Sequence, residues 1–128
     1  ILNQSLFIIG DSNSEKNSLD QIISMIDKEK KFEIIYVVIH HAFPEGLRQA
    51  ANGPGRHNFI KDSYFKDKFE NNNKKIIFLY GDGGAFKNKP RYKFIKLGNS
   101  YHMISGIGEL KGDTIFVISD KNLYRMEL

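Results

Sequence analysis

The pattern of apolar positions predicts three buried strands in the first two thirds of the chain. Residues 6–9, 34–39 and 75–80 are short, nearly continuous apolar runs rich in β-branched and aromatic residues. Such runs are typical of strands that are buried on both faces of a sheet. Ligands of open α/β sheets bind beyond the carboxyl ends of the strands. We therefore expect any chemistry to lie where the second and third runs end.

Two helical patterns separate these runs. Between the first and second runs, apolar residues recur at positions i, i+3, i+4 and i+7, as on a helix that packs against a sheet: Leu19, Ile22, Ile23 and Ile26. Ser18 and Gln21 have the spacing of a capping box, which predicts that this helix begins near Ser18. A second helix is expected to run from a cap at Asn58 to about Phe69, with Phe65 and Phe69 on one face. The order predicts two β-α-β units with parallel strands.

The last third of the chain has a different pattern. Residues 91–97, 101–107, 114–119 and 123–128 are short strand-like runs that leave little room for helices. Gly98-Asn99 and residues 120–122 are connections of hairpin size. The predicted fold class is therefore α/β, with two β-α-β units followed by an antiparallel β-meander.

Composition narrows the possible classes of protein. The chain has 128 residues, of which 41% are hydrophobic, and this size predicts one domain over residues 1–128. The absence of cysteine excludes disulfides, thiolate catalysis and zinc-thiolate sites and is compatible with any compartment. No apolar run has the length of a membrane span.

The net charge of +4 is spread along the chain, so we do not expect specific nucleic-acid binding. The chain starts at Ile1 without a methionine or a signal peptide, and we expect a processed product or a fragment.

The residues that carry candidate chemistry follow the second and third runs. His40 and His41 end the second run, and Gly81-Asp82-Gly83-Gly84 follows the third. Neighbouring side chains on an extended backbone point in opposite directions, so we expect the two histidines to face different sides. A loop over residues 45–56, rich in small residues, follows the histidines, and long loops at strand ends often carry function. The structural alternative is that the two histidines simply end a strand.

Four segments resemble the calcineurin-like metallophosphoesterases, a group that includes the purple acid phosphatases. Residues 7–14 are similar to the strand and "LDSN"-like turn of that family, residues 37–42 to its "VVxHHP" segment, and residues 79–84 stand where it has "GHxH". Residues 101–109 are similar to the segment that follows, which often ends in a Gly-rich turn. The similarity covers nearly the whole chain and corresponds to the C-terminal half of the family's domain. It implies half of a metallophosphoesterase β-sandwich, and hence a C-terminal fragment of a larger metallophosphoesterase-like domain.

The resemblance also implies a set of site residues. His40 takes the place of a metal ligand, and Asp82, in the position of the first "GHxH" histidine, can bind a hard divalent cation such as Mn, Fe or Zn through oxygen. Gly84 replaces the second histidine and offers no side-chain ligand. His41 is the expected catalytic residue, and Arg56 and His57 are the expected substrate-binding residues.

The family's other ligands lie in "DxH", "GDxxD" and "GNHD" motifs, and none of these occurs here. We therefore expect metal-dependent phosphoester hydrolysis only where another segment or chain supplies the missing ligands. The expected partner is a complementary N-terminal segment or a second copy of the chain. The first alternative is a non-catalytic binding or interaction module of the same fold.

A second alternative takes Gly10-Asp11-Ser12 as the nucleophile block of a GDSL-type (SGNH) esterase or acyltransferase. A serine between a buried strand and a helix is suitably placed for nucleophilic attack. That family also needs an Asp-x-x-His sequence to activate the serine, and the chain contains none. The remaining histidines, His57 and His102, are isolated along the chain, which is typical of surface positions rather than of ligands.

Overall fold

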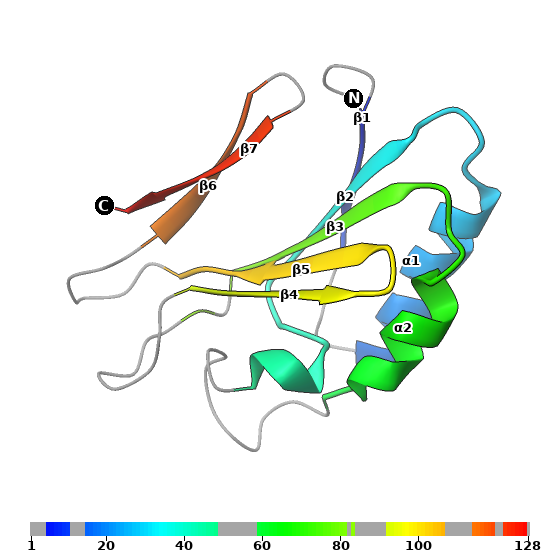
Figure 1. Ribbon diagram of the computed structural model, residues 1–128, viewed down its shortest axis with the longest axis horizontal. Helices are drawn as coiled ribbons and strands as arrows, with labels where there is room; N and C mark the ends of the chain where they lie inside the picture. The colour runs from blue at the N-terminus through cyan, green and yellow to red at the C-terminus, as the bar shows by residue number, and fades with distance from the viewer. Residues whose placement is uncertain are drawn as a thin grey trace.

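The computed structural model describes residues 5–10, 15–48, 59–81, 83, 92–106, 114–119 and 122–127. These residues form an α/β fold with two sheets and two helices (Figure 1). The elements follow in the order β1 (Ser5–Ile9), α1 (Glu15–Lys28), β2 (Ile34–Ile39), the 3-10 helix η1 (Glu45–Leu47), α2 (Asp62–Phe69), β3 (Lys75–Tyr80), β4 (Lys93–Leu97), β5 (Ser100–Ile104), β6 (Thr114–Ser119) and β7 (Asn122–Glu127).

The larger sheet has five strands in the order β1-β2-β3-β5-β4. β1, β2, β3 and β5 are parallel, and β4 pairs with β5 in the antiparallel sense. The two predicted β-α-β units and the α/β class are thereby confirmed. The expected meander is divided between two sheets, because β4 and β5 join the parallel strands while β6 and β7 form a separate hairpin.

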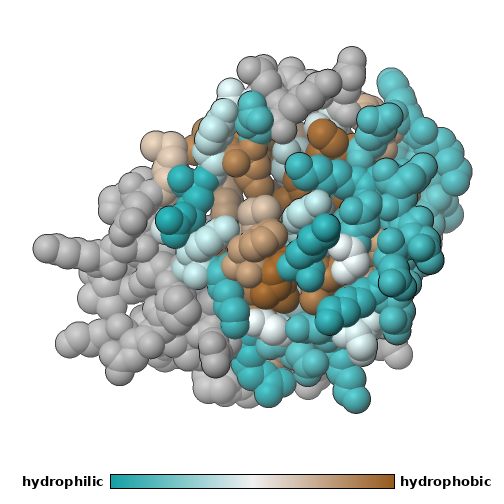
Figure 2. All heavy atoms as spheres, in the orientation of Figure 1, coloured by the Kyte–Doolittle hydropathy of each residue, from teal (hydrophilic) through white to brown (hydrophobic). Residues whose placement is uncertain are grey.

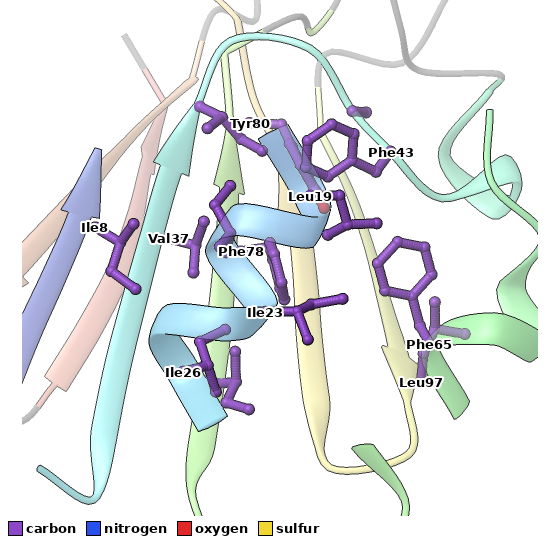
Figure 3. Packing of buried hydrophobic residues seen from close by; sticks show 14 of the residues in the cluster. Ile8, Leu19, Ile23, Ile26, Val37, Phe43, Phe65, Phe78, Tyr80 and Leu97 are labelled. Atoms are coloured by element: carbon purple, nitrogen blue, oxygen red, sulfur yellow. The ribbon is translucent and has the colours of Figure 1, made fainter. Parts of the chain in front are cut away.

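The helices cover one face of the five-stranded sheet. The apolar stripe of α1 is buried in one cluster with residues of β2 and β3, and Figure 3 shows Leu19, Ile23 and Ile26 of α1 in that cluster together with Val37 and Phe78. α2 contributes Phe65 and Phe69, both fully buried as their spacing predicted. The helix starts differ from the predicted ones. α1 begins at Glu15, so Ser18 lies inside it, and α2 begins after Lys61, which makes no side-chain capping bond.

The hairpin β6-β7 covers part of the other face. Phe116, Ile118 and Leu123 pack against a second cluster built around Tyr36, Ile77 and Leu79. In Figure 1 the hairpin lies on the side of the sheet away from α1 and α2. Figure 2 shows hydrophobic atoms over the strands in the middle of the view, bordered by hydrophilic side chains on the side of the helices. The five-stranded sheet is therefore the middle layer of three, and the carboxyl ends of its parallel strands lie along one side of it.

The connection between β4 and β5 fixes the end of α2. Gly98 has a φ of +59°, a conformation that glycine adopts without strain. The backbone N–H of Asn99 donates to the carbonyl of Phe69 over 2.9 Å, and its side-chain amide donates to the carbonyls of Asn72 and Lys74. The turn thus satisfies the Phe69 carbonyl at the helix end and also holds the segment between α2 and β3.

Candidate functional site

The carboxyl ends of the four parallel strands, β1, β2, β3 and β5, lie side by side at one end of the sheet, called here the carboxyl edge. Backbone pairing continues beyond the strands, because the N–H of Gly81 donates to the carbonyl of His40 over 3.1 Å and the N–H of Gly83 donates to that of Ser105 over 2.8 Å. Gly10 is similarly held by its N–H, which donates to the carbonyl of Val38 over 3.1 Å. The segments after the strands are therefore fixed relative to one another where an α/β sheet binds ligands.

A pocket of about 710 Å³ opens at this edge. Strand ends form one side of it and β6 forms the other. Its lining is mainly apolar, with polar groups from His40, Ser105 and Thr114, and it includes Ile9, Gly10, Val38, Ile39, Leu79, Tyr80, Gly81, Gly106, Ile115, Phe116 and Ile118. An apolar pocket with a few polar groups is the usual form of a small-molecule site.

His40 and His41 lie together at this edge. Their ring centroids are 4.6 Å apart with the ring planes inclined by 52°; His40 is exposed and His41 is half-buried. The expectation that they face different sides is wrong here, because β2 ends at Ile39 and the backbone bends at both histidines. The His40 ring also lies near Gly81, since a Cβ added there would be 3.4 Å from His40 Nδ1. The two imidazole rings are therefore neighbours at this end of the sheet, and His40 lines the pocket.

The donor set of the described residues supports only part of a metal site. Within the described part of the chain, no three His, Asp or Glu side chains lie close enough to hold a metal ion. His40 and His41 are the described histidines at this end of the sheet, and imidazole nitrogens are common ligands of divalent cations. The other expected site residues, Asp82, Arg56 and His57, lie outside the described residues.

Ser12, the nucleophile of the esterase alternative, also lies outside the described residues, so that alternative stays a prediction. The described residue before it, Gly10, is closely packed. A Cβ at Gly10 would lie 2.9 Å from Ile39 Cγ2 and 3.2 Å from Ile22 Cδ1. The chain therefore leaves β1 through a space between β2 and α1 that accepts only glycine without rearrangement.

The prediction that His102 is a surface residue is wrong. It is fully buried on β5, stacked on Phe78 with a centroid distance of 4.6 Å and an interplanar angle of 5°. The edge of the Phe65 ring packs against it at 4.8 Å. Ser100, His102 and Ile104 alternate along β5 and are all buried. That period of two is the sequence signal that places His102 on the helix-covered face.

His102 is the centre of a buried hydrogen-bond chain. Its Nδ1 lies 2.9 Å from Tyr80 Oη, and its Nε2 lies 2.8 Å from Ser100 Oγ. The Ser100 hydroxyl donates to the carbonyl of Leu97 over 2.7 Å, so Ser100 Oγ accepts from His102 Nε2–H. The tautomer assigned from this network leaves Nδ1 as the acceptor for the Tyr80 hydroxyl. Every polar atom of the neutral imidazole is thereby satisfied.

Burial keeps both His102 and Tyr80 of this hydrogen-bond network neutral. It lowers the pKa of His102 from 6.5 to about 3, because the imidazolium loses its hydration in an apolar surrounding. Burial also raises the pKa of the Tyr80 phenol well above 10, while a backbone hydrogen bond from Phe43 acts in the opposite direction. Figure 3 shows Phe43 beside Tyr80 at the end of β3. Phe43 lies two residues after His41. The hydrogen bond from Phe43 to Tyr80 therefore anchors the segment that carries His40 and His41.

The chain matches no protein-family model, no curated protein and no solved structure. None of the described helices has both the length and the apolar character needed to cross a membrane.

Proposed function

We propose that this chain is a metallophosphoesterase-like domain in which His40 binds a divalent cation, Mn, Fe or Zn, at the carboxyl edge of the sheet. Phosphoester hydrolysis is proposed only for an assembly in which another segment or chain supplies the missing ligands. The observation that carries the proposal is the exposed His40 ring, 4.6 Å from the ring of His41, at a pocket of about 710 Å³ formed by the strand ends. The resemblance of residues 37–42 and 79–84 to the family's segments supplies the choice of phosphoesters.

Five residues have a proposed role in this site. The imidazoles of His40 and His41 donate nitrogen lone pairs, with His41 as the proposed catalytic residue. Asp82 is the proposed oxygen ligand, and Arg56 and His57 are the proposed contacts to an anionic substrate. A bound divalent cation supplies a water activated for attack on phosphorus.

A non-catalytic binding module of the same fold is the second candidate. It is favoured by the sequence, in which Gly84 stands in place of the second "GHxH" histidine and the family's "DxH", "GDxxD" and "GNHD" motifs do not occur. A site with two imidazoles binds a cation or a small ligand, but it does not hold both the attacking and the leaving oxygen of a displacement. The two candidates therefore share the histidine pair and differ in whether turnover occurs once the remaining ligands are present.

The proposed partner is a complementary N-terminal segment or a second copy of the chain. On the hairpin, Tyr124 and Met126 are each about half exposed, at 50% and 49%, and they stand opposite Val117 and Ile115 in the register. Residues directly opposite each other in an antiparallel pair share one face, so this face of the hairpin is apolar and open to solvent. Ile9, at the end of β1, is 83% exposed. Such apolar surface is typical of protein–protein contacts.

The metal proposal can be tested by NMR on the imidazole signals during titration with Mn²⁺. The chain has four histidines, and the fully buried His102 is an internal control. We expect paramagnetic broadening of the His40 and His41 signals at Mn²⁺ concentrations that leave His102 sharp. Calorimetric titration with Zn²⁺ should show binding that His40→Ala abolishes. Equal binding by wild type and His40→Ala, or broadening of all four histidines together, would remove His40 from the site.

A further inference from the structure

A second pocket, of about 390 Å³, lies between the five-stranded sheet and the hairpin. It is toward the amino end of β3, because Lys75 and Ile77 line it, whereas the histidine edge lies at the opposite end of that strand. The lining residues that matter here come from β4, β5, the hairpin and the residue before β4: Tyr92, Phe94, Tyr101, Met103, Phe116 and Arg125. The volume lies within the range of roughly 300–1,000 Å³ that is usual for small-molecule sites.

Aromatic rings from separate segments form the walls of this pocket. Phe94 of β4 stacks on Tyr101 of β5 with a centroid distance of 6.3 Å and an interplanar angle of 22°. Tyr92 meets Phe116 of β6 edge to face at 6.2 Å. Phe94 remains 44% exposed, so part of this aromatic surface is open. A planar ring that enters the pocket has aromatic surface on both the sheet side and the hairpin side.

Positively charged side chains lie over two of these rings. Arg125 lies 4.6 Å from the centroid of Tyr92, and Lys75 and Lys96 lie 5.6 Å and 5.4 Å from that of Tyr101. Among the described lining residues there is no Asp or Glu, and no ion pair joins these three cations to another described residue. The pocket therefore combines π surfaces with positive charge that no described carboxylate offsets.

We propose that this pocket binds a planar aromatic anion of the mononucleotide class. The ring of the base stacks on the aromatic wall, and the phosphate group meets Arg125 and Lys75 at the rim. The two halves of such a ligand match the two kinds of group in the pocket, since aromatic stacking and charge-assisted hydrogen bonds each contribute independently to affinity. The proposal does not depend on the metal site, because none of its groups belongs to the histidine edge.

The test uses adenosine monophosphate as the probe, with adenosine and inorganic phosphate as its two halves. We expect saturable binding of the nucleotide, measured by calorimetry without added metal, and much weaker binding of either half. Arg125→Gln should weaken binding about tenfold, the loss of one charge-assisted contact. Tyr101→Leu should weaken it by a similar factor through lost stacking. The matched control is Arg48→Gln, because Arg48 lies over Phe59 at 5.1 Å in the same kind of contact but outside the pocket.

Methionine methyl signals locate the ligand. The chain has three methionines; Met103 lines the pocket, whereas Met25 is exposed on α1. We expect the nucleotide to shift the Met103 methyl signal and to leave that of Met25 in place. Equal binding of nucleotide and inorganic phosphate, or equal losses in the Arg125 and Arg48 variants, would overturn the proposal. The proposal would also be overturned if the wild type bound a short oligothymidylate but did not bind adenosine monophosphate.

Discussion

The buried imidazole of His102 makes the stability of this protein depend on pH in a defined window. In the folded protein the pKa of His102 is lowered to about 3, whereas an unfolded chain has the ordinary value of 6.5. Between these values the unfolded chain binds a proton that the folded protein does not. The free energy of unfolding therefore rises with pH across the window, and stability is lost as the pH falls below 6.5.

The size of the effect follows from the two pKa values. One pKa unit corresponds to about 1.4 kcal/mol, so acidification from pH 7 to pH 5 should lower the free energy of unfolding by about 2 kcal/mol. Most carboxyl groups remain ionised above pH 5, which keeps their contribution small over this range. A loss of this size is easily measured, because domains of this kind are stable by only about 5–15 kcal/mol.

The assay is urea unfolding at several pH values between 7 and 5, followed by circular dichroism. His102→Phe preserves the stack on Phe78 and removes the titrating group, so its free energy of unfolding should be nearly constant over the same range. At pH 7 this variant should be less stable by about 1–3 kcal/mol, because the buried Tyr80 hydroxyl loses its acceptor. The double variant with Tyr80→Phe removes that hydroxyl and should recover part of the loss.

His40→Gln is the matched control, since the His40 ring is exposed to water. This variant should keep the pH dependence of the wild type. Equal stability of the wild type at pH 7 and pH 5, or a wild-type pH dependence in His102→Phe, would show that His102 does not control this loss of stability.

Three further predictions concern the turn, the open surface and the chemistry. Gly98→Ala should lower the free energy of unfolding by about 1–3 kcal/mol, because φ is +59° and the new Cβ would lie 2.9 Å from the backbone N of Glu70. The control Gly81→Ala should change the free energy of unfolding by less than about 0.5 kcal/mol. Equal urea midpoints for the two variants would contradict this prediction. The wild type should associate in sedimentation velocity, and serine at both Tyr124 and Met126 should reduce that association; a wild type that is monomeric at every concentration would count against it. The isolated chain should not hydrolyse an aryl phosphate with added Mn²⁺ above background, and turnover that disappears in His40→Ala would prove this wrong.

The sequence by itself determined the local elements. Continuous apolar runs placed β2 and β3, and the 3.6-residue period placed the buried face of α1. The spacing of Phe65 and Phe69 also placed both on the buried face of α2, and Gly98-Asn99 marked the turn between β4 and β5. These features depend on which face of an element each side chain occupies, and the backbone geometry of helices and strands fixes that from spacing alone.

Only the tertiary structure decided which elements meet. The pattern of short strands did not indicate that β5 pairs with β3, because strand pairing depends on contacts between residues far apart in sequence. The alternation along β5 indicates a buried His102, but its hydrogen-bond partner Tyr80 became visible only once β3 and β5 paired. The direction of the His40 and His41 rings depended on where β2 ends, and one residue of extended backbone reverses a side chain. Residue spacing along one segment carries no information about these partners, so they emerge only when the layers of the fold pack together.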